Sequence, residues 1–591
     1  MSCLGNAAMN PAQLLAHFDR ISEAPDAIPR LRRFILDLAV RGKLVEQDQN
    51  DEPAGELLKR IQEEKAKRIK AGEMRSPRVI EWTDSIEKLF PVFNSWAWVR
   101  LADVGAIVGG GTPQSNDADN FTAGGTGIAW LTPADLGRHN ELYVSHGSRD
   151  ITEKGLKSSS ATLIPKDSVL FTSRAPIGYT AISANEITTN QGFKSVVPYI
   201  TECSRYIALY LKAFGPWIDS KASGTTFREV SGKVVSGLPI PLPPLPEQHR
   251  IVAKVDELMA LCDQLEAAKA ERENQRDRLI AASLHRLNSS DDADASRESA
   301  RFYLNHLPRL TTRPEHIKQL RQTILNLAVR GRLVPQDPND ELAGELLKRI
   351  QEQKAMLVKS GEIREIRKGN LLPLVDKNQT LYSLPTGWEW TRLGVVCFLI
   401  SDGTHHTPKY ENSGIHFLSV KDVSSGSINF SNTRFISEAT HLELCKRCKP
   451  EFGDILLTKV GTTGIAVTVD TTQEFSIFVS LALLKFSQIN LDGQYLRMLI
   501  NSPFVRQQSA DNTQGIGNKN LVLRLINQFS IPLPPLAEQH RIVAKVDELM
   551  ALCDQLETQL TTTQTDSRRL LEALLHRALE EPDLIPFLSR L

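Results

Sequence analysis

The sequence predicts an α+β protein built as an internal duplication, in which two strand-rich α/β domains are joined by two long antiparallel coiled-coil helices. Two observations predict this fold class. Stretches with helical periodicity occur twice in nearly the same form, about 290 residues apart, and such a repeat organises a whole chain. Between them lie segments rich in Gly, Thr, Ser, Val and Ile, whose short apolar runs between turn residues are typical of strands.

The first repeated segment is helical and begins with prolines. Residues 241–266 read PLPPLPEQHRIVAKVDELMALCDQLE and residues 532–557 read PLPPLAEQHRIVAKVDELMALCDQLE, so that a single position differs. A second pair accompanies it, IPRLRRFILDLAVRGKLVEQDQNDEPAGELLKRIQEEK from Ile28 and IKQLRQTILNLAVRGRLVPQDPNDELAGELLKRIQEQK from Ile317. Each half therefore runs from helical segment to insert to helical segment, which predicts a pseudo-twofold frame.

Abrupt changes of composition divide the chain into five segments. They are an N-terminal helical segment over 1–95, a first insert domain over 96–240, a central spacer helix with the second helical repeat over 241–385, a second insert domain over 386–531 and a C-terminal spacer helix over 532–591. Runs such as IAWLTPADL, SVLFTSRAPIGYTAI, DILLTKVGTTGIAVTVD and FSIFVSLALLKF predict strands. The inserts align only through short stretches, such as WVRL with WTRL and GGTP with DGTHHTP. One fold with two divergent surfaces is the simplest account.

The repeated helices carry an apolar seam with alternating spacings of four and three residues, which is typical of a coiled coil. Its members are Ile251, Val255, Leu258, Cys262 and Leu265, and again Ile542, Val546, Leu549, Cys553 and Leu556. Each helix would be roughly 60 Å long at about 1.5 Å per residue. Because two similar seams can bury each other, we expect the helices to pair, and the alternative is that each packs on its own insert domain.

Polar positions on these helices repeat as faithfully as the apolar ones. A core alone would not fix residues that face solvent, so we interpret them as two identical docking faces for two copies of one partner. Recent duplication or gene exchange is the alternative. The candidate partner-binding residues are Glu247, Gln248, Arg250, Glu538, Gln539 and Arg541.

Composition points to a cytoplasmic protein. The chain has 591 residues with a formal net charge of zero, and no apolar run is long enough to span a membrane. Its start lacks the pattern of a secretory signal. Seven cysteines are too sparse for a disulfide framework. The balanced charge counts weakly against nucleic acid, whose binders often carry a basic excess, although a partner could supply that charge.

No catalytic motif accounts for the chain. The sequence contains no phosphate-binding loop, no dinucleotide fingerprint, no [DN]-P-P-[YF] tetrapeptide, no H-E-x-x-H and no G-x-S-x-G. The stretch HLELCKRC offers His441, Cys445 and Cys448 as zinc ligands, but a closed site needs four and the first insert has no counterpart. Cys262 and Cys553 fit a helical core better than a reactive site. We therefore expect no catalytic residue and no metal.

Both inserts carry cations and amides in turn-rich segments. Arg and Lys suit phosphates and guanine acceptors, whereas Asn and Gln suit adenine edges. Singly each is more often a solvated loop residue, but their recurrence on matched inserts favours DNA. The candidate DNA-binding residues are Thr112, Arg174, Gln191, Lys194 and Arg228 in the first insert, and Thr404, Lys421, Lys459, Asn518 and Lys519 in the second.

These motifs together closely resemble the specificity subunit of type I restriction-modification systems. The resemblance rests on LPPLPEQHRIVAKVDEL at Leu242, LPPLAEQHRIVAKVDEL at Leu533 and LAVRGRLVPQDPNDE at Leu327, and it covers nearly the whole chain. The first copy, LAVRGKLVEQDQNDE at Leu38, departs from the second at Glu46 and Gln49. The resemblance implies that each insert is a target recognition domain reading one half of a split, asymmetric double-stranded DNA site, with the helices setting the gap.

The resemblance also implies the partners and cofactors. Two modification subunits, which use S-adenosylmethionine to methylate adenine, would dock on the repeated frame, and two ATP-driven restriction subunits with Mg²⁺ would join them. This chain itself would hold no cofactor. A coiled-coil scaffold with two divergent protein-binding domains is the alternative function, and an enzyme with its own site ranks below it because the motifs are missing.

Overall fold

The structure is a computed structural model. It describes residues 24, 26–72, 86–139, 141–174, 176–224, 228–289, 293–363, 382–515 and 519–580. The chain divides into two compact units, one of residues 1–272 with 563–591 and the other of residues 273–562. Each unit contains one insert domain, so the division follows the duplication.

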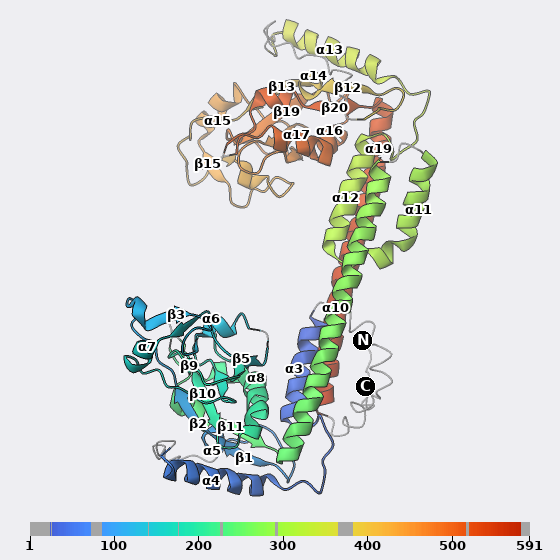
Figure 1. The fold of residues 1–591 in the computed structure, drawn as a ribbon. Coiled ribbons are helices and arrows are strands. Elements are labelled where there is room, and N and C mark those ends of the chain that lie inside the picture. Colours follow the sequence, from blue (N-terminus) through green and yellow to red (C-terminus); the bar gives the residue numbers. More distant parts are fainter. Residues whose placement is uncertain are drawn as a thin grey trace. The chain divides into compact units, whose positions relative to one another are not determined.

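Long helices form the frame of each unit (Figure 1). In the first unit these are α3 (Ala27–Val40), α4 (Ala54–Lys70), the start of α10 (Leu245–Ser289) and the end of α19 (Leu536–Glu580). The second unit has α11 (Ala293–Leu310), α12 (Pro314–Val329), α13 (Ala343–Lys359) and the remainder of α10 and α19. Helix α10 leads from the first unit into the second, and α19 leads back.

A glycine ends the first repeated helix in both units. Gly42 follows α3 with φ +74°, and the next amide, Lys43 N, donates to the carbonyl of Leu38 over 2.9 Å. Gly331 follows α12 with φ +67°, and Arg332 N donates to the carbonyl of Leu327 at the same distance. This hydrogen bond defines a Schellman cap, whose positive φ glycine adopts without strain. The repeated LAVRG stretch is therefore a helix stop.

The first insert domain is built around a mixed five-stranded sheet in the order β2-β10-β7-β8-β5, in which only β5 and β8 run parallel. Its helix α8 (Ser204–Ser220) covers the sheet. The remaining elements are α5 (Leu101–Val104), α6 (Pro133–Leu136), α7 (Glu153–Lys157) and α9 (Gly232–Gly237), with strands β2 (Gly105–Gly109), β3 (Phe121–Ala123), β4 (Trp130–Leu131), β5 (Tyr143–Val144), β6 (Arg149–Ile151), β7 (Val169–Phe171), β8 (Thr180–Ser183), β9 (Thr188–Thr189) and β10 (Lys194–Pro198).

The second insert domain splits its strands between an antiparallel four-stranded sheet, β13-β19-β16-β17, and a three-stranded sheet, β15-β14-β18. Its strands are β13 (Cys397–Asp402), β14 (Ile415–Leu418), β15 (Arg434–Ile436), β16 (Ile455–Thr458), β17 (Ala466–Thr468), β18 (Phe475–Ile477) and β19 (Leu481–Phe486), and its helices are α14 (Leu393–Val396), α15 (Glu438–Cys445), α16 (Gly493–Asn501), α17 (Pro503–Asp511) and α18 (Leu523–Asn527). Strands predicted from the four apolar runs are confirmed in both domains.

Each insert domain begins and ends in one two-stranded antiparallel ribbon. In the first domain β1 (Ala97–Arg100) pairs with β11 (Pro239–Leu242), and in the second β12 (Glu389–Arg392) pairs with β20 (Ser530–Leu533). The W-x-R-L stretches therefore form the first strand of each ribbon. The prolines that precede the long helices form the second.

The seam residues lie in the cores of their own units. Ile251, Val255, Leu258 and Cys262 join a buried cluster with Ile35 of α3 and the first insert domain, and a separate cluster unites their counterparts on α19 with α12 and the second insert domain. Within each unit the seam therefore packs on that unit's own helices and insert domain, as the alternative expected. Leu265 does not belong to either core, because it is 40% exposed.

No helix within the described residues is both long and apolar enough to cross a bilayer.

Candidate nucleic-acid interface

The EQHR segment at the start of α10 is fastened to its own unit. Trp96 Nε1 donates to Oε2 of Glu247 over 3.0 Å, and the Gln47 amide donates to the other carboxylate oxygen. Glu247 is only 1% exposed. Burial raises the pKa of Glu247 above its ordinary value, and the hydrogen bonds from Gln47 and Trp96 offset only part of that rise.

The second unit repeats this arrangement on α19. Trp388 Nε1 and Gln336 Nε2 donate to Glu538 over 2.9 and 3.0 Å. Burial raises the pKa of Glu538 as well. Each glutamate thus joins the helix start to the loop after the glycine stop and to the tryptophan just before the first strand of the insert domain, which gives the repeated segment a structural role in both units.

Other polar residues of the segment also face their own unit. Gln248 is fully buried and donates from Nε2 to the Pro243 carbonyl over 2.9 Å, and Gln539 is buried in the same way. Arg250 and Arg541 each form an ion pair of 2.6 Å with an aspartate of their own unit. The interpretation of Glu247 and Gln248 as solvent-facing is therefore wrong, because interior hydrogen bonds account for their repetition. A docking role for the six residues stays a prediction.

In the first insert domain, predicted DNA-binding residues gather around an unpredicted carboxylate, Glu229. Arg174 donates to its Oε2 from Nε over 2.8 Å and Lys194 Nζ lies 3.3 Å from its Oε1. Burial alone would raise the pKa of Glu229, but the Arg174 hydrogen bond and the Lys194 charge outweigh it and hold the pKa below its usual range. The carboxylate is therefore ionised at neutral pH.

The remaining candidates of this domain lie beside that cluster. Thr112 donates from its hydroxyl to the amide oxygen of Gln191, whose carbonyl also accepts from Lys194 Nζ over 3.5 Å. Arg228 directly precedes Glu229 in the chain and pairs with Asp219 over 3.3 Å. Residues separated by more than a hundred positions are thus brought to one edge of the sheet, around the end of β2 and the start of β10.

In the second insert domain the counterpart of this cluster forms around Asp402, the last residue of β13. Lys459 Nζ lies 3.0 Å from its Oδ2, and Lys459 is only 5% exposed. Lys459 therefore supports the site from inside, rather than facing a ligand as the sequence suggested. Thr404 lies two residues further on, where its hydroxyl donates to the carbonyl of His406 over 3.0 Å.

The other candidates of the second domain lie nearby or outside the description. Lys421 is exposed and donates to the carbonyl of Asn432 over 3.0 Å. Lys519 is exposed, and its carbonyl accepts a hydrogen bond from the amide of Gly461, two residues after Lys459. Asn518 lies outside the described residues.

The sequence missed the two carboxylates and Arg447. Arg447 lies just beyond α15 and donates from Nη2 to Oδ1 of Asp402 over 2.6 Å. The available signals were the DGTHHTP stretch, which begins with Asp402, and the KR pair between the two cysteines of HLELCKRC. In a sequence, a carboxylate alone does not indicate DNA binding, because its cationic neighbours become known only from the fold.

The possible zinc ligands of HLELCKRC have other partners. His441 Nδ1 lies 2.9 Å from the Ser476 hydroxyl, and Cys445 Sγ lies 3.5 Å from His441 Nε2. Burial raises the pKa of the Cys448 thiol to about 11, so it is protonated at neutral pH. Within the described ranges no group of three or more His, Cys, Asp or Glu side chains could hold a metal ion.

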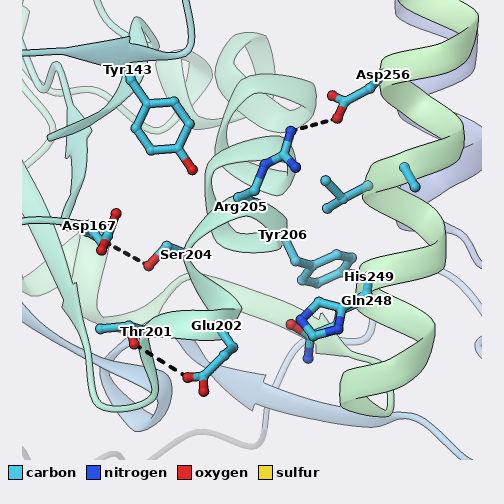
Figure 2. Close-up of a pocket in the computed structure, with 12 residues that line it drawn as sticks. Tyr143, Asp167, Thr201, Glu202, Ser204, Arg205, Tyr206, Gln248, His249 and Asp256 are labelled. Carbon is cyan, nitrogen blue, oxygen red and sulfur yellow. Dashed lines mark hydrogen bonds and ion pairs between the residues drawn. The ribbon is translucent and has the colours of Figure 1, made fainter. Parts of the chain in front are cut away.

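A depression of about 460 Å³ lies between the first insert domain and α10 (Figure 2). Arg205 of α8 pairs across it with Asp256 of α10 over 2.6 Å, and the Tyr143 side chain points toward it. The position of Arg205, directly before the buried Tyr206, corresponds to Gln494 before the buried Tyr495. Because glutamine cannot form an ion pair, this contact is specific to the first unit.

Comparison with known proteins identifies the family. The family described as "Type I restriction modification DNA specificity domain" matches residues 94–273 and 385–563. The EcoEI specificity subunit of Escherichia coli is 29% identical over 577 residues, which cover 93% of this chain and 94% of that protein. The EcoAI specificity subunit of Escherichia coli is 29% identical over 568 residues with the same coverage. The HsdS crystal structure from Thermoanaerobacter tengcongensis is 19% identical, with 84% of this chain and 99% of that chain covered and a TM-score of 0.40.

Since the family matches cover more than half of the sequence, the chain belongs to the specificity subunits of type I restriction-modification systems. It is a DNA sequence recognition subunit without a catalytic role of its own, which confirms the prediction made from its motifs. A specificity subunit assembles with the other subunits of its restriction-modification complex and with DNA.

Proposed function

We propose that the two insert domains act as target recognition domains, each reading one half of a bipartite, asymmetric DNA site. The observation that carries this proposal is the pair of cation clusters, one around Glu229 and one around Asp402, on domains that share a frame and differ in surface. Different surfaces on equivalent supports suit different half-sites. Arg and Lys side chains supply both phosphate and guanine contacts.

Partner subunits would supply the chemistry and much of the affinity. The chain has no net charge, so modification subunits around the DNA would share the phosphate contacts whose counterion release drives binding. Those subunits would use S-adenosylmethionine to methylate adenine, and restriction subunits would use ATP and Mg²⁺. Two copies of each follow from the duplicated frame.

The two copies would dock on exposed residues that are identical in both units. Leu261 of α10 and Leu552 of α19 occupy matching positions and are 38% and 47% exposed, and apolar side chains in a repeated surface favour a protein contact. The identity of the two helices ends at Glu266 and Glu557, beyond which exposed positions differ. The EQHR segment, whose glutamate and glutamine are buried, then positions this face instead of forming it.

Stoichiometry tests the docking proposal. Leu261→Asp should reduce the complex from two modification subunits to one, and adding Leu552→Asp should leave none, as measured by native mass spectrometry. Ala267→Asp is the matched control, because Ala267 is exposed on the same helix where the second unit has Thr558. Retention of both partner copies by the double variant would refute this docking face.

Methylation mapping tests the DNA proposal. Base-resolution mapping of N6-methyladenine, in cells expressing this chain with its modification partner, should give a split motif with a fixed gap. Exchanging residues 96–240 or 386–531 for those of a relative should change one half of the motif at a time. Absence of any motif, with the partner bound and active, would favour the scaffold alternative.

The long helices are proposed to set that gap. Both α10 and α19 cross the boundary between the units, so every covalent path between the two insert domains includes helix. Two readers that approach one face of B-DNA need half-sites about one helical turn, roughly 34 Å, apart. A helix of 45 residues spans more than that distance at about 1.5 Å per residue.

A further inference from the structure

One buried carboxylate holds three side chains that can carry positive charge in the second insert domain. Asp402 is 4% exposed, and its two oxygens accept from Lys459 over 3.0 Å, Arg447 over 2.6 Å and His405 over 3.2 Å. These partners come from three separate loops. Lys459 is buried beside the carboxylate, whereas the Arg447 side chain is 60% exposed.

This arrangement leaves Arg447 fixed but available. A guanidinium carries five N–H donors in a rigid fork, and Arg447 uses Nη2 on Asp402. The remaining donors are free to meet a ligand at the surface. The buried Lys459 already balances the Asp402 charge, so the cluster remains positive toward DNA.

The first insert domain contains a cluster of the same composition. Glu229 binds Arg174 over 2.7 Å and Lys194 over 3.3 Å, and the arginine is again the more exposed cation. The carboxylate here lies on the loop before α9, whereas Asp402 ends a strand. Each domain therefore presents one exposed arginine. A carboxylate anchors that arginine, and a less exposed lysine pairs with the same carboxylate.

The two clusters do not descend from the same residues. In the first domain Gly109 pairs with Lys194 across β2 and β10. In the second domain Asp402 pairs with Ala482 across β13 and β19, the equivalent pair of strands. The anchoring carboxylate of one domain thus matches a glycine in the other, and a lysine matches an alanine. Duplication cannot explain the shared composition, which suggests a shared task.

We propose that each insert domain reads a guanine in its half-site with one carboxylate-anchored arginine, Arg174 in the first domain and Arg447 in the second. This inference rests on the proposed function and names the side chains that carry it. Bidentate donation to O6 and N7 is the commonest specific contact to guanine. Anchoring removes rotamer freedom before binding, so less entropy is lost when the contact forms.

The test is motif mapping with single variants in the assembled methyltransferase. Arg447→Ala should lower discrimination at one guanine of the second half-site about five- to hundredfold, which corresponds to about 1–3 kcal/mol for a bidentate base contact. Arg447→Lys should not restore it, because an ammonium lacks the fork. Arg174→Ala should lower discrimination at one guanine of the first half-site only. Exchange of the insert domains shows which half-site belongs to which domain.

Lys446→Ala is the matched control, since Lys446 precedes Arg447, is 72% exposed and pairs only with Glu443 among the described residues. It should leave both half-sites unchanged, and all four variants should keep the thermal unfolding midpoint. An unchanged second half-site in Arg447→Ala, a second half-site with no guanine, or simultaneous loss of both halves with a lowered midpoint would overturn the inference. Absence of any motif for the wild type would instead overturn the proposed function.

Discussion

At the scale of single residues, the frame contains two buried glutamates whose negative charge is disfavoured by burial. Glu247 and Glu538 are nearly inaccessible to solvent, and each accepts hydrogen bonds from one tryptophan and one glutamine. Burial raises the pKa of both carboxyl groups above the ordinary value of a glutamate. The helix starts are therefore held by groups that respond to pH.

Mild acid should stabilise the fold through these glutamates. Because burial raises their pKa above the unfolded value, the folded chain binds more protons, and the free energy of unfolding falls as pH rises through the folded pKa. The double variant Glu247→Gln, Glu538→Gln lacks this dependence. Denaturant midpoints between about pH 8 and pH 5 should shift in favour of the wild type as pH falls; a constant difference would contradict the assignment.

A buried tyrosine also holds each domain ribbon. Tyr206 donates from its hydroxyl to the carbonyl of Pro241 over 2.7 Å, and Tyr495 does the same to Pro532 over 3.1 Å. Tyr206→Phe should lower the free energy of unfolding by about 1 kcal/mol, because it removes one buried hydrogen bond. Tyr143→Phe, at a side chain 41% exposed, should have no measurable effect in the same denaturant titration. Equal effects of the two variants would contradict this assignment.

At the scale of elements, sequence periodicity predicted the long helices correctly but did not identify which elements of each unit pack on them. The spacing of apolar residues shows that one helix face is buried, but any neighbour can bury it. Here α3 and the first insert domain cover the α10 seam as far as Cys262. Identical polar residues were equally ambiguous, because a buried glutamine such as Gln248 looks like a surface one in the sequence.

Substitutions along the seam should separate its buried and exposed members. Leu258→Ala should destabilise the chain by about 2–4 kcal/mol, because Leu258 lies in the core of the first unit. Leu265→Ala on the same helix should cost less than about 1 kcal/mol, because that side chain is exposed. Thermal unfolding of both variants checks the difference. A large effect of Leu265→Ala would contradict the exposed position of this side chain.

The candidate site was predictable in kind but not in detail. The sequence picked out cations in turn-rich loops, and in the structure Arg174 and Lys194 pair with the same carboxylate. Glu229, the carboxylate that both cations contact, lies on a loop more than thirty residues after Lys194. No local sequence pattern predicts that contact. Arg447 was missed for the same reason, since its partner Asp402 lies 45 positions earlier.

At the scale of the whole molecule, the spacer proposal makes a geometric prediction. Inserting four helical residues after Arg272 in α10 and after Thr562 in α19 lengthens each helix by about 6 Å. At about 3.4 Å per base pair, the gap between half-sites should grow by about two base pairs. Methylation mapping measures the gap. The same insertion after Gly72, in a turn beyond α4, should leave it unchanged.

An unaltered gap in the double insertion would refute the spacer role without touching base recognition. A lost motif with intact partner binding would mean that the units no longer engage both half-sites together. The turn insertion separates either outcome from a general effect of added residues.

The ribbon that closes each insert domain has a consequence for how new specificities arise. Because β1 lies against β11 and β12 against β20, both ends of a domain enter the frame at one place. A replacement domain of different length can therefore join the frame at the same two adjacent points, as is usual for inserted domains whose termini lie close together. Such a domain is a cassette, and one crossover within each flanking segment exchanges it whole. Under the proposed function, one genetic event would then change one half of the DNA target, without any matching change in the partner subunits.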